Sequence, residues 1–459
     1  MTPEEFRRHG HYAIDWVADF LEHVERYPVL PPLKPGELTD ALPAHGPEKG
    51  EPMEAILADF ERLIVPASTQ WNHPGFLAYF ANSGTPESIL GELLAAALNG
   101  NGMVWKTSPA VTELEQVTLR WLREWSGLPA EWFGLIYDTA STSSMHAIAA
   151  AREAADPQSR THGTSRGLVV YTSEQSHSSI EKGAIAVGIG KDHVRQVPVD
   201  AEFRMRPDAL QALIEADLAA GLRPCMVAAT VGTTSTTSVD PVPAIADICA
   251  RYGVWLHVDA AYAGSAALAP EFRWAFAGCD RADSMVMNPH KWLQVTMDCS
   301  VFYTSRPEVL RRAFSLSREY LETAGDPRAV NLMDYGVPLG RRFRALKLWF
   351  VMRSYGHEGL AAMVREHVRL ARWFAGEVEA DARFEVAAPV HFSVVNFRFK
   401  GSDEENRRIL DRVNAAGEVF LSSTVLNGKY TLHLAVGNYQ TSERHVARAW
   451  ALVKGAVDG

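Results

Sequence analysis

The sequence has little cysteine and no long hydrophobic run. Its four cysteines lie 24, 30 and 20 residues apart, which is neither the close pairing of a zinc site nor the density of a disulfide scaffold. We therefore predict no metal site and reduced, mostly buried thiols. The N-terminus, MTPEEFRRHGHY, lacks the apolar core of a signal peptide, and no apolar run reaches the ~18 residues that span a bilayer. These absences favour a cytoplasmic protein.

The sequence also lacks an excess of basic residues. It has 45 Lys and Arg against 55 Asp and Glu, a formal charge of −10, which argues against a dedicated nucleic-acid binder or a polybasic membrane anchor. Hydrophobic residues make up 47% and charged residues 22% of the 459 residues, as in ordinary globular proteins, and we find no repeat or low-complexity segment. At ~150 residues per domain, the length predicts about three structural units. This balance favours a small-molecule partner.

The chain begins with the pattern of one amphipathic helix. Thr2 can cap it, Pro3 lies in its first turn and Glu5 completes a capping box. Apolar residues follow at helical spacing until the helix stops near Tyr27 and Pro28, where a proline-rich, extended stretch begins. Such a helix has no core of its own, so we expect it to pack on a partner or on the main body.

From about residue 86, short apolar runs alternate with helical patterns. The runs lack polar alternation, which is typical of strands buried on both faces. The pattern therefore predicts an α/β domain with a largely parallel sheet. The last 110 or so residues carry a long helical pattern and further strands, which predicts a smaller α+β domain. The six runs of the large domain are GLIY, GLVVYTS, CMVAATV, VWLHVDA, SMVMN and SVFYTS.

Polar residues follow three of these runs where the strands should end. Asp259 ends VWLHVDA, Lys291 follows SMVMN, and Ala140 and Ser141 lie between GLIY and a helix start. Because ligands of open parallel sheets bind beyond the carboxyl ends of the strands, all three should face one crevice. A helix start suits a phosphate, a buried carboxylate can keep a pyridine nitrogen protonated, and a lysine can form a Schiff base with an aldehyde. Together they match the pyridoxal-phosphate arrangement.

Each of these residues also has an ordinary interpretation. An Asp at a strand end is usually a turn residue, a lone Lys is usually a solvated charge, and a Ser/Thr run at a helix start is usually a cap. Asp259 and Lys291 are 32 residues apart, which leaves room for one more strand and crossover. Their common placement at strand ends favours the cofactor site.

Seven stretches occur in the order HPGFLAYF, TSPAVTELE, SEQSHSSIEKG, VGTTSTTSVDP, LHVDAAYAGSA, NPHKWLQVTMDCS and PLGRRFRALKLWFVMRSYG. In them the chain resembles the group II pyridoxal-phosphate decarboxylases, and most closely the aromatic-L-amino-acid decarboxylase branch. The resemblance implies the aspartate-aminotransferase fold (fold type I), with a mostly parallel seven-stranded sheet. It also implies a homodimer with its active site at the subunit interface. The implied units are an N-terminal helical segment (1–85), a large cofactor domain (86–345) and a small C-terminal domain (346–459).

The resemblance also implies roles for individual residues. Lys291 corresponds to the lysine that binds the cofactor, Asp259 to the partner of the pyridine nitrogen, and His177 to the histidine stacked on the ring. Tyr320 corresponds to a tyrosine of a mobile loop that returns a proton to the product carbon. The implied cofactor-binding residues are Lys291, Asp259, His177, Ala140, Ser141, Thr234, Asn288, His290 and Gly340, the last from the other subunit. The implied substrate-binding residues are Trp71, Tyr79, Phe80, Met103, His177 and Thr234.

The predicted reaction is decarboxylation of an aromatic L-amino acid, namely tryptophan, tyrosine, phenylalanine or dihydroxyphenylalanine, to the arylalkylamine. Relatives that form aldehydes lack either the tyrosine at 320 or the histidine at 177, whereas this chain keeps both. An aldehyde synthase or an aminotransferase on the same fold is one alternative, and a catalytically silent cofactor-binding relative is another. Asp138 departs from the family pattern, which has a small residue, often glycine, at this position. An acid near a phosphate is unfavourable unless it points away.

Overall fold

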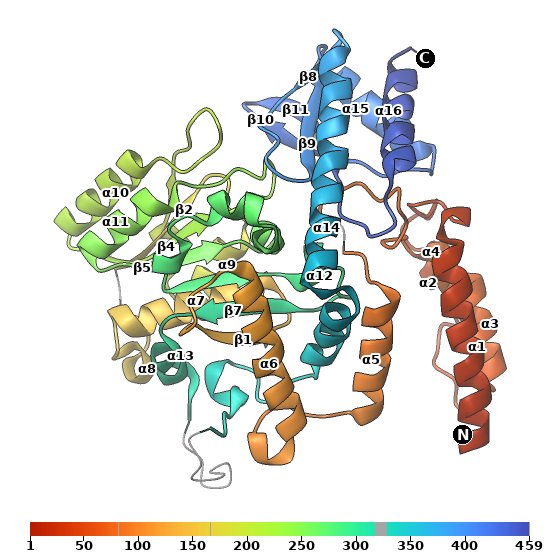
Figure 1. The fold of residues 1–459 in the computed structure, drawn as a ribbon, viewed down its shortest axis with the longest axis horizontal. Coiled ribbons are helices and arrows are strands. Elements are labelled where there is room, and N and C mark those ends of the chain that lie inside the picture. The colour runs from red at the N-terminus through yellow and green to blue at the C-terminus, as the bar shows by residue number, and fades with distance from the viewer. Residues whose placement is uncertain (81, 166, 317–327, 459) are drawn as a thin grey trace.

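The computed structural model describes residues 1–80, 82–165, 167–316 and 328–458 (Figure 1). Its centre is a seven-stranded sheet in the order β1-β7-β6-β5-β4-β2-β3. All neighbouring strands pair in parallel except β7, which is antiparallel to both β1 and β6. The predicted mostly parallel sheet of fold type I is therefore confirmed. The strands are β1 (Phe133–Tyr137), β2 (Leu168–Ser173), β3 (Val194–Val197), β4 (Arg223–Thr230), β5 (Trp255–Asp259), β6 (Ser284–Met287) and β7 (Ser300–Thr304).

Both faces of this sheet are covered, and the side chains of each strand alternate between two cores. On β2, Val169 and Tyr171 belong to one core, whereas Leu168 and Val170 belong to the other. This is why the strands read as continuous apolar runs. The helices around the sheet are α5 (Pro86–Leu98), α6 (Pro109–Ser126), α7 (Ala140–Ala155), α8 (Ser159–His162), α9 (Ser179–Ala186), α10 (Pro207–Ala219), α11 (Val242–Tyr252), α12 (Pro289–Trp292) and α13 (Pro307–Phe314).

A smaller layer follows the long helix α14 (Arg344–Ala380), which is broken at Gly356, where φ is 64°. Four antiparallel strands in the order β10-β11-β9-β8 pack against α14 and two further helices. Phe374, Phe397 and Trp450 meet edge to face in their core. The elements are β8 (Phe384–Val386), β9 (Val394–Phe399), α15 (Asp403–Ala415), β10 (Ser422–Leu426), β11 (Lys429–Ala435) and α16 (Glu443–Asp458).

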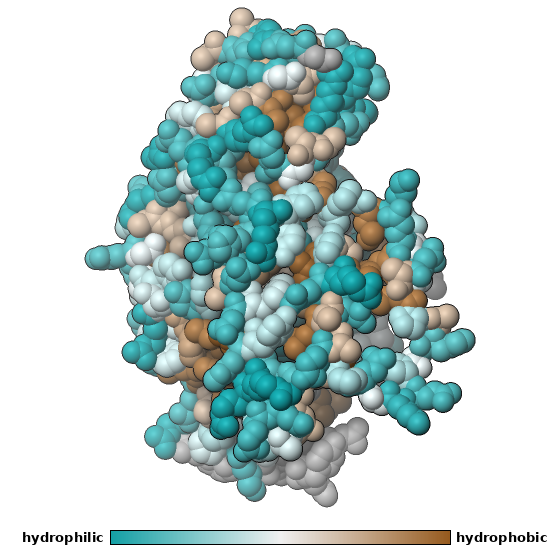
Figure 2. Space-filling view, turned by 90° about the vertical axis from the view of Figure 1, so that its right-hand side faces the viewer, coloured by the Kyte–Doolittle hydropathy of each residue, from teal (hydrophilic) through white to brown (hydrophobic). Residues whose placement is uncertain are grey.

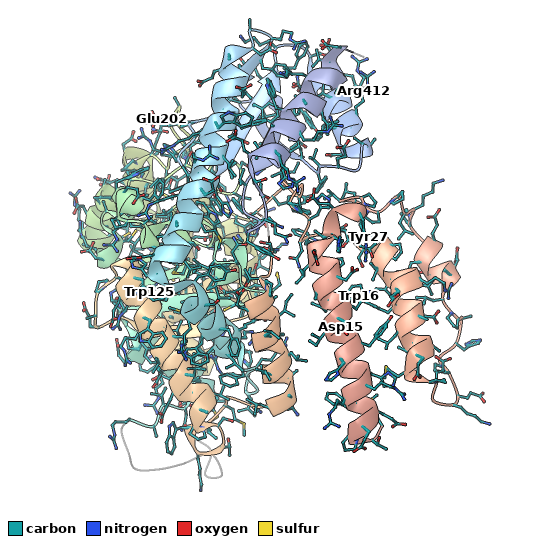
Figure 3. The ribbon with its side chains drawn as sticks, turned by 45° about the vertical axis from the view of Figure 1, so that its right-hand side comes forward. Asp15, Trp16, Tyr27, Trp125, Glu202 and Arg412 are labelled. Atoms are coloured by element: carbon teal, nitrogen blue, oxygen red, sulfur yellow. The ribbon has the colours of Figure 1, made fainter. Side chains whose placement is uncertain are left out.

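The N-terminal helices stand away from the rest of the chain (Figures 1 and 3). Helix α1 (Pro3–Glu22) has the predicted capping box between Thr2 and Glu5. It ends at Glu22, earlier than predicted, because a short 3-10 turn (Val24–Arg26) follows. The other helices of this part are α2 (Glu37–Ala41), α3 (Met53–Asp59) and α4 (Val65–Ala67).

Little of α1 is covered. Trp16 contacts Phe60, with 4.9 Å between the ring centroids, but Leu21 is the one buried residue of the helix. The carbonyl of Leu21 accepts a hydrogen bond from the Gln440 side chain, and Glu25, just after the helix, forms an ion pair with Arg444. These two contacts join the end of α1 to the small C-terminal layer. None of the helices in the described residues is both long and apolar enough to cross a membrane.

Candidate active site

A cavity of about 210 Å³ opens at the carboxyl ends of β4, β5 and β6. Thr230 and Asp259 end two of these strands, and Asn288 directly follows the third. The strand register pairs Thr230 with Asp259, so the two residues sit side by side at the floor. Nine of the residues singled out from the sequence line this cavity: Phe80, Ala140, Ser141, His177, Thr234, Asp259, Asn288, His290 and Lys291.

Lys291 projects from the short helix α12 into this cavity. Its Nζ lies 4.9 Å from the centroid of the Phe80 ring, and that ring stacks on Tyr262 at 4.0 Å. Burial lowers the pKa of the Lys291 amine, and the negative charge of Asp259 opposes the shift. A larger fraction of this amine is therefore uncharged at neutral pH than in a solvated lysine, which makes it a nucleophile.

Asp259 is 6% exposed and is anchored by its own turn. One carboxylate oxygen accepts the backbone N–H of Ala261 at 3.0 Å, and Asp259 lines the cavity. The charge of Asp259 raises the pKa of both Lys291 and His177 against the effect of their burial. It is therefore a negative centre that a cationic ligand atom can meet.

The ring of His177 stands at the cavity wall in a defined orientation. Its Nδ1 accepts the backbone N–H of Ser179 at 3.2 Å and lies 2.9 Å from the Ser179 hydroxyl. The neutral ring therefore carries its proton on Nε2. Partial loss of water lowers the pKa of His177, and the neighbouring Lys291 lowers it further. His177 is thus largely neutral at pH 7, with an N–H donor to offer.

The start of helix α7 forms another part of the wall. Ala140 and Ser141 lie in its first turn, where backbone N–H groups have no partner within the helix. Asp138, the acid that departs from the family pattern, turns one carboxylate oxygen back to accept the N–H of Thr139 at 2.7 Å. The first turn of α7 can therefore bind an anion.

Residues 35–400 match the family described as the pyridoxal-dependent decarboxylase conserved domain. This chain belongs to that family. An aromatic-L-amino-acid decarboxylase of Catharanthus roseus is 38% identical over 100% of this chain and 95% of its own length. A phenylacetaldehyde synthase of a Rosa hybrid cultivar is 38% identical over 99% and 94%. The structure of Oryza sativa TDC with PLP and tryptamine superposes with a TM-score of 0.97, at 37% identity over 100% and 98%.

The cavity of this pyridoxal-dependent decarboxylase fits pyridoxal phosphate. Lys291 offers an amine that can react with the aldehyde, and Asp259 offers a carboxylate that can pair with the ring nitrogen. The start of α7 can bind the phosphate. Two buried polar atoms in its wall, Asn288 Oδ1 and Thr230 Oγ1, have no hydrogen-bond partner among the described residues. A polar ligand satisfies such atoms, whereas an apolar ligand would leave them unpaired.

Four predicted site residues of this decarboxylase do not line the cavity of a single chain. Trp71 and Tyr79 are 38% and 55% exposed, and their rings stack with the centroids 6.3 Å apart. Met103 lies in the segment before α6, and Gly340 lies beside Asn101. Their predicted roles therefore stay predictions. Tyr320 lies outside the described residues, so its role also stays a prediction.

The sequence did not reveal every residue of the cavity wall. A sequence feature could have indicated two of the residues that were missed. Thr230 ends a buried strand as Asp259 does, and Ser179 lies two residues after His177. Tyr262 enters the wall by stacking on Phe80, which no spacing could indicate. The residues that were missed are Thr139, Ser179, Thr230, Gly232, Ala261, Tyr262 and Met297.

Proposed function

We propose that this chain decarboxylates an aromatic L-amino acid to the arylalkylamine and CO₂. The observation that carries the proposal is the convergence of Lys291 and Asp259 on one cavity whose wall includes the Phe80 ring. Aromatic walls suit an aromatic side chain. Two of the similar proteins support the substrate class, since one is named an aromatic-L-amino-acid decarboxylase and the other holds tryptamine.

Each residue has a defined task in this proposal. Bound pyridoxal phosphate supplies an aldehyde that links to amines and a ring that takes up the electron pair left by CO₂. With the cofactor bound, Lys291 would hold the aldehyde through its uncharged amine and would take the place of the product amine when that leaves. Asp259 holds a proton on the ring nitrogen. His177 presents Nε2–H to the substrate carboxylate, and Tyr320 returns a proton to the substrate carbon.

The phenylacetaldehyde synthase among the relatives makes an oxidative outcome the second candidate. His177 and Tyr320 are both present in this chain, which favours simple decarboxylation. We also propose a cytoplasmic location. All four cysteines are free and buried, and burial raises the pKa of each thiol to about 12, which suits a reducing compartment.

A panel of L-amino acids tests the reaction. We expect the purified, cofactor-loaded protein to release CO₂ and the matching amine, in equal amounts, from at least one of tryptophan, tyrosine, phenylalanine and dihydroxyphenylalanine. Glutamate, which carries no ring, should give neither product. Amines are quantified by mass, and aldehyde and peroxide are measured in the same samples. Aldehyde as the main product would select the second candidate, and no product from any aromatic amino acid would refute both.

We further propose that the functional form is a homodimer. Helix α5 exposes Leu90, Leu93, Leu94 and Leu98. Helix α1 and the helical stretch 53–64 also expose large apolar side chains. Figure 2 views the side of the molecule on which these helices lie and shows apolar patches between hydrophilic side chains. Apolar side chains that are exposed together on one side of a molecule are typical of a protein interface. A second copy of the chain would cover it.

The mass in solution tests the dimer. We expect sedimentation to give twice the chain mass of 50.6 kDa. The double variant Leu94→Asp/Leu98→Asp should sediment as a single chain and lose at least about tenfold in activity, because charges in an apolar interface are costly. Leu218→Asp on α10 is the matched control, since Leu218 is a similarly exposed helical leucine on another side. A wild-type protein that sediments as one chain at full activity would contradict the dimer.

A further inference from the structure

Gln294 lies three residues after Lys291 in an unusual backbone conformation. Its φ is 58°, in the left-handed region that residues other than glycine rarely adopt. Its side chain is fully buried. A conformation of this kind persists only where the surrounding contacts hold it in place. The contacts of Gln294 therefore hold it in this conformation.

The side-chain amide of Gln294 joins two segments that are far apart in sequence. Its Oε1 accepts a hydrogen bond from the hydroxyl of Ser83, and its Nε2 donates to the carbonyl of Gly437 at 2.8 Å. The backbone carbonyl of Gln294 accepts the N–H of Thr85 at 3.2 Å. One buried residue thus connects the segment that carries Lys291, the segment 83–85 and the loop that follows β11.

The segment 83–85 continues directly from the aromatic wall of the cavity. Phe80 and Asn82, which precede it, both line the cavity, and Asn82 Nδ2 lies 3.7 Å from Met297 Sδ. At Gly84 the two segments touch, because a Cβ there would collide with Thr296. Ser88 also exchanges hydrogen bonds with Thr296, at 2.8 and 2.9 Å. The hydrogen bond from Ser83 to Gln294 is the side-chain contact between these segments that lies nearest the wall, so it holds the wall end of the segment close to Lys291.

A second hydrogen-bonded route runs beside the first. Trp292, next to Lys291, donates its indole N–H to His367 Nδ1 at 2.9 Å. The other ring nitrogen of His367 lies 3.1 Å from the carbonyl of Asn438 and donates to it. This route holds the segment of Lys291 to the small C-terminal layer without Gln294. Loss of the Gln294 amide should therefore leave Lys291 in place and release mainly the wall formed by Phe80 and Asn82.

We propose that Gln294 is a positioning residue that sets the affinity for the aromatic substrate by holding the wall formed by Phe80 and Asn82 against the segment of Lys291. Gln294 is not among the residues that line the cavity. This inference rests on the proposed function, because it assigns the wall to the substrate's ring. It predicts a change in substrate binding with no change in cofactor attachment.

Three variants separate the amide from its backbone conformation. Gln294→Leu removes both side-chain hydrogen bonds at similar size, Gln294→Gly also removes them but relieves the positive φ, and Ser83→Ala removes one. We expect KM to rise about tenfold in the Leu and Gly variants and about threefold in Ser83→Ala, with kcat within about twofold. The double variant Ser83→Ala/Gln294→Leu should match Gln294→Leu, because the two groups form one pair.

The readouts distinguish this inference from a purely structural role and from failure of the proposed function. The cofactor absorbance band and the borohydride-fixed adduct at Lys291 should be unchanged in all variants. Binding of L-tryptophan methyl ester and L-tyrosine methyl ester, which cannot lose CO₂, is followed by that band and needs no turnover. The affinity for these esters should fall by the same factors as KM rises. Wild-type affinity in cofactor-loaded Gln294→Leu would overturn the inference, as would full recovery in Gln294→Gly. If Gln294→Leu does not fold, wild-type affinity in Ser83→Ala overturns it.

Discussion

Replacing Lys291 by alanine should abolish amine formation, with a loss of at least about 10³-fold. Lys291 is the one lysine that lines the cavity within the described part of the chain. Its amine combines nucleophilic attack with proton transfer during product release, and no neighbouring group can do both. Mass spectrometry after borohydride reduction should find the cofactor fixed to the peptide that contains residue 291 in the wild type and to no peptide in the variant.

The loss cannot be attributed to unfolding. Burial lowers the pKa of Lys291, so the charged amine is less favourable in the folded state than in the unfolded chain. Its removal therefore takes no charge stabilisation from the folded protein at neutral pH, and circular dichroism should show a folded variant at the assay temperature. Lys191→Ala is the control, because Lys191 is a largely exposed lysine paired with Glu181. Cofactor fixed to another lysine, or residual turnover above a few per cent, would contradict the assignment.

The strands and the polar residues at their ends could be predicted from the sequence for one physical reason. A strand buried on both faces is apolar along most of its length, so a charged or amide residue marks its end, here Asp259 and Asn288. The rule fails at β3, whose residues include Arg195 and Gln196, because an edge strand at the margin of the sheet keeps polar side chains. This seventh strand was expected only from the family resemblance.

Other parts of the site depend on contacts that no local pattern records. Gln294 matters because Ser83 and Gly437 meet it, and these residues lie more than 100 positions away on either side. Tyr262 lies in the predicted motif LHVDAAYAGSA, but its stacking between Phe80 and Trp292 becomes visible only in three dimensions. Trp71 and Tyr79 are exposed in one chain and do not line its cavity, so their contact with substrate stays a prediction.

Asp259→Asn should lower activity by about 10³-fold while the protein stays folded. The variant has nearly the same size and can still accept the N–H of Ala261, but it carries no charge. An attraction of roughly 5–6 kcal/mol is expected between a carboxylate and a protonated ring nitrogen ~3 Å away at an effective dielectric of ~20. The net effect is smaller because of desolvation, and about 4 kcal/mol corresponds to the expected loss. The fall should appear in kcat, and cofactor affinity should also decrease.

The pH dependence of activity distinguishes a direct role of Asp259 at the ring nitrogen from an indirect effect on the pKa of Lys291. The charge of Asp259 raises the pKa of Lys291, so its removal lets that pKa fall further and leaves the amine uncharged down to a lower pH. If Asp259 acted only through Lys291, activity at neutral pH would be kept or increased in Asp259→Asn. A loss at every pH therefore assigns Asp259 to the ring nitrogen. Asp138→Asn is the matched control: it removes an acid at the same edge of the sheet whose carboxylate binds its own turn, and it should keep activity. Equal losses in both variants would indicate a general charge effect and refute the specific pairing.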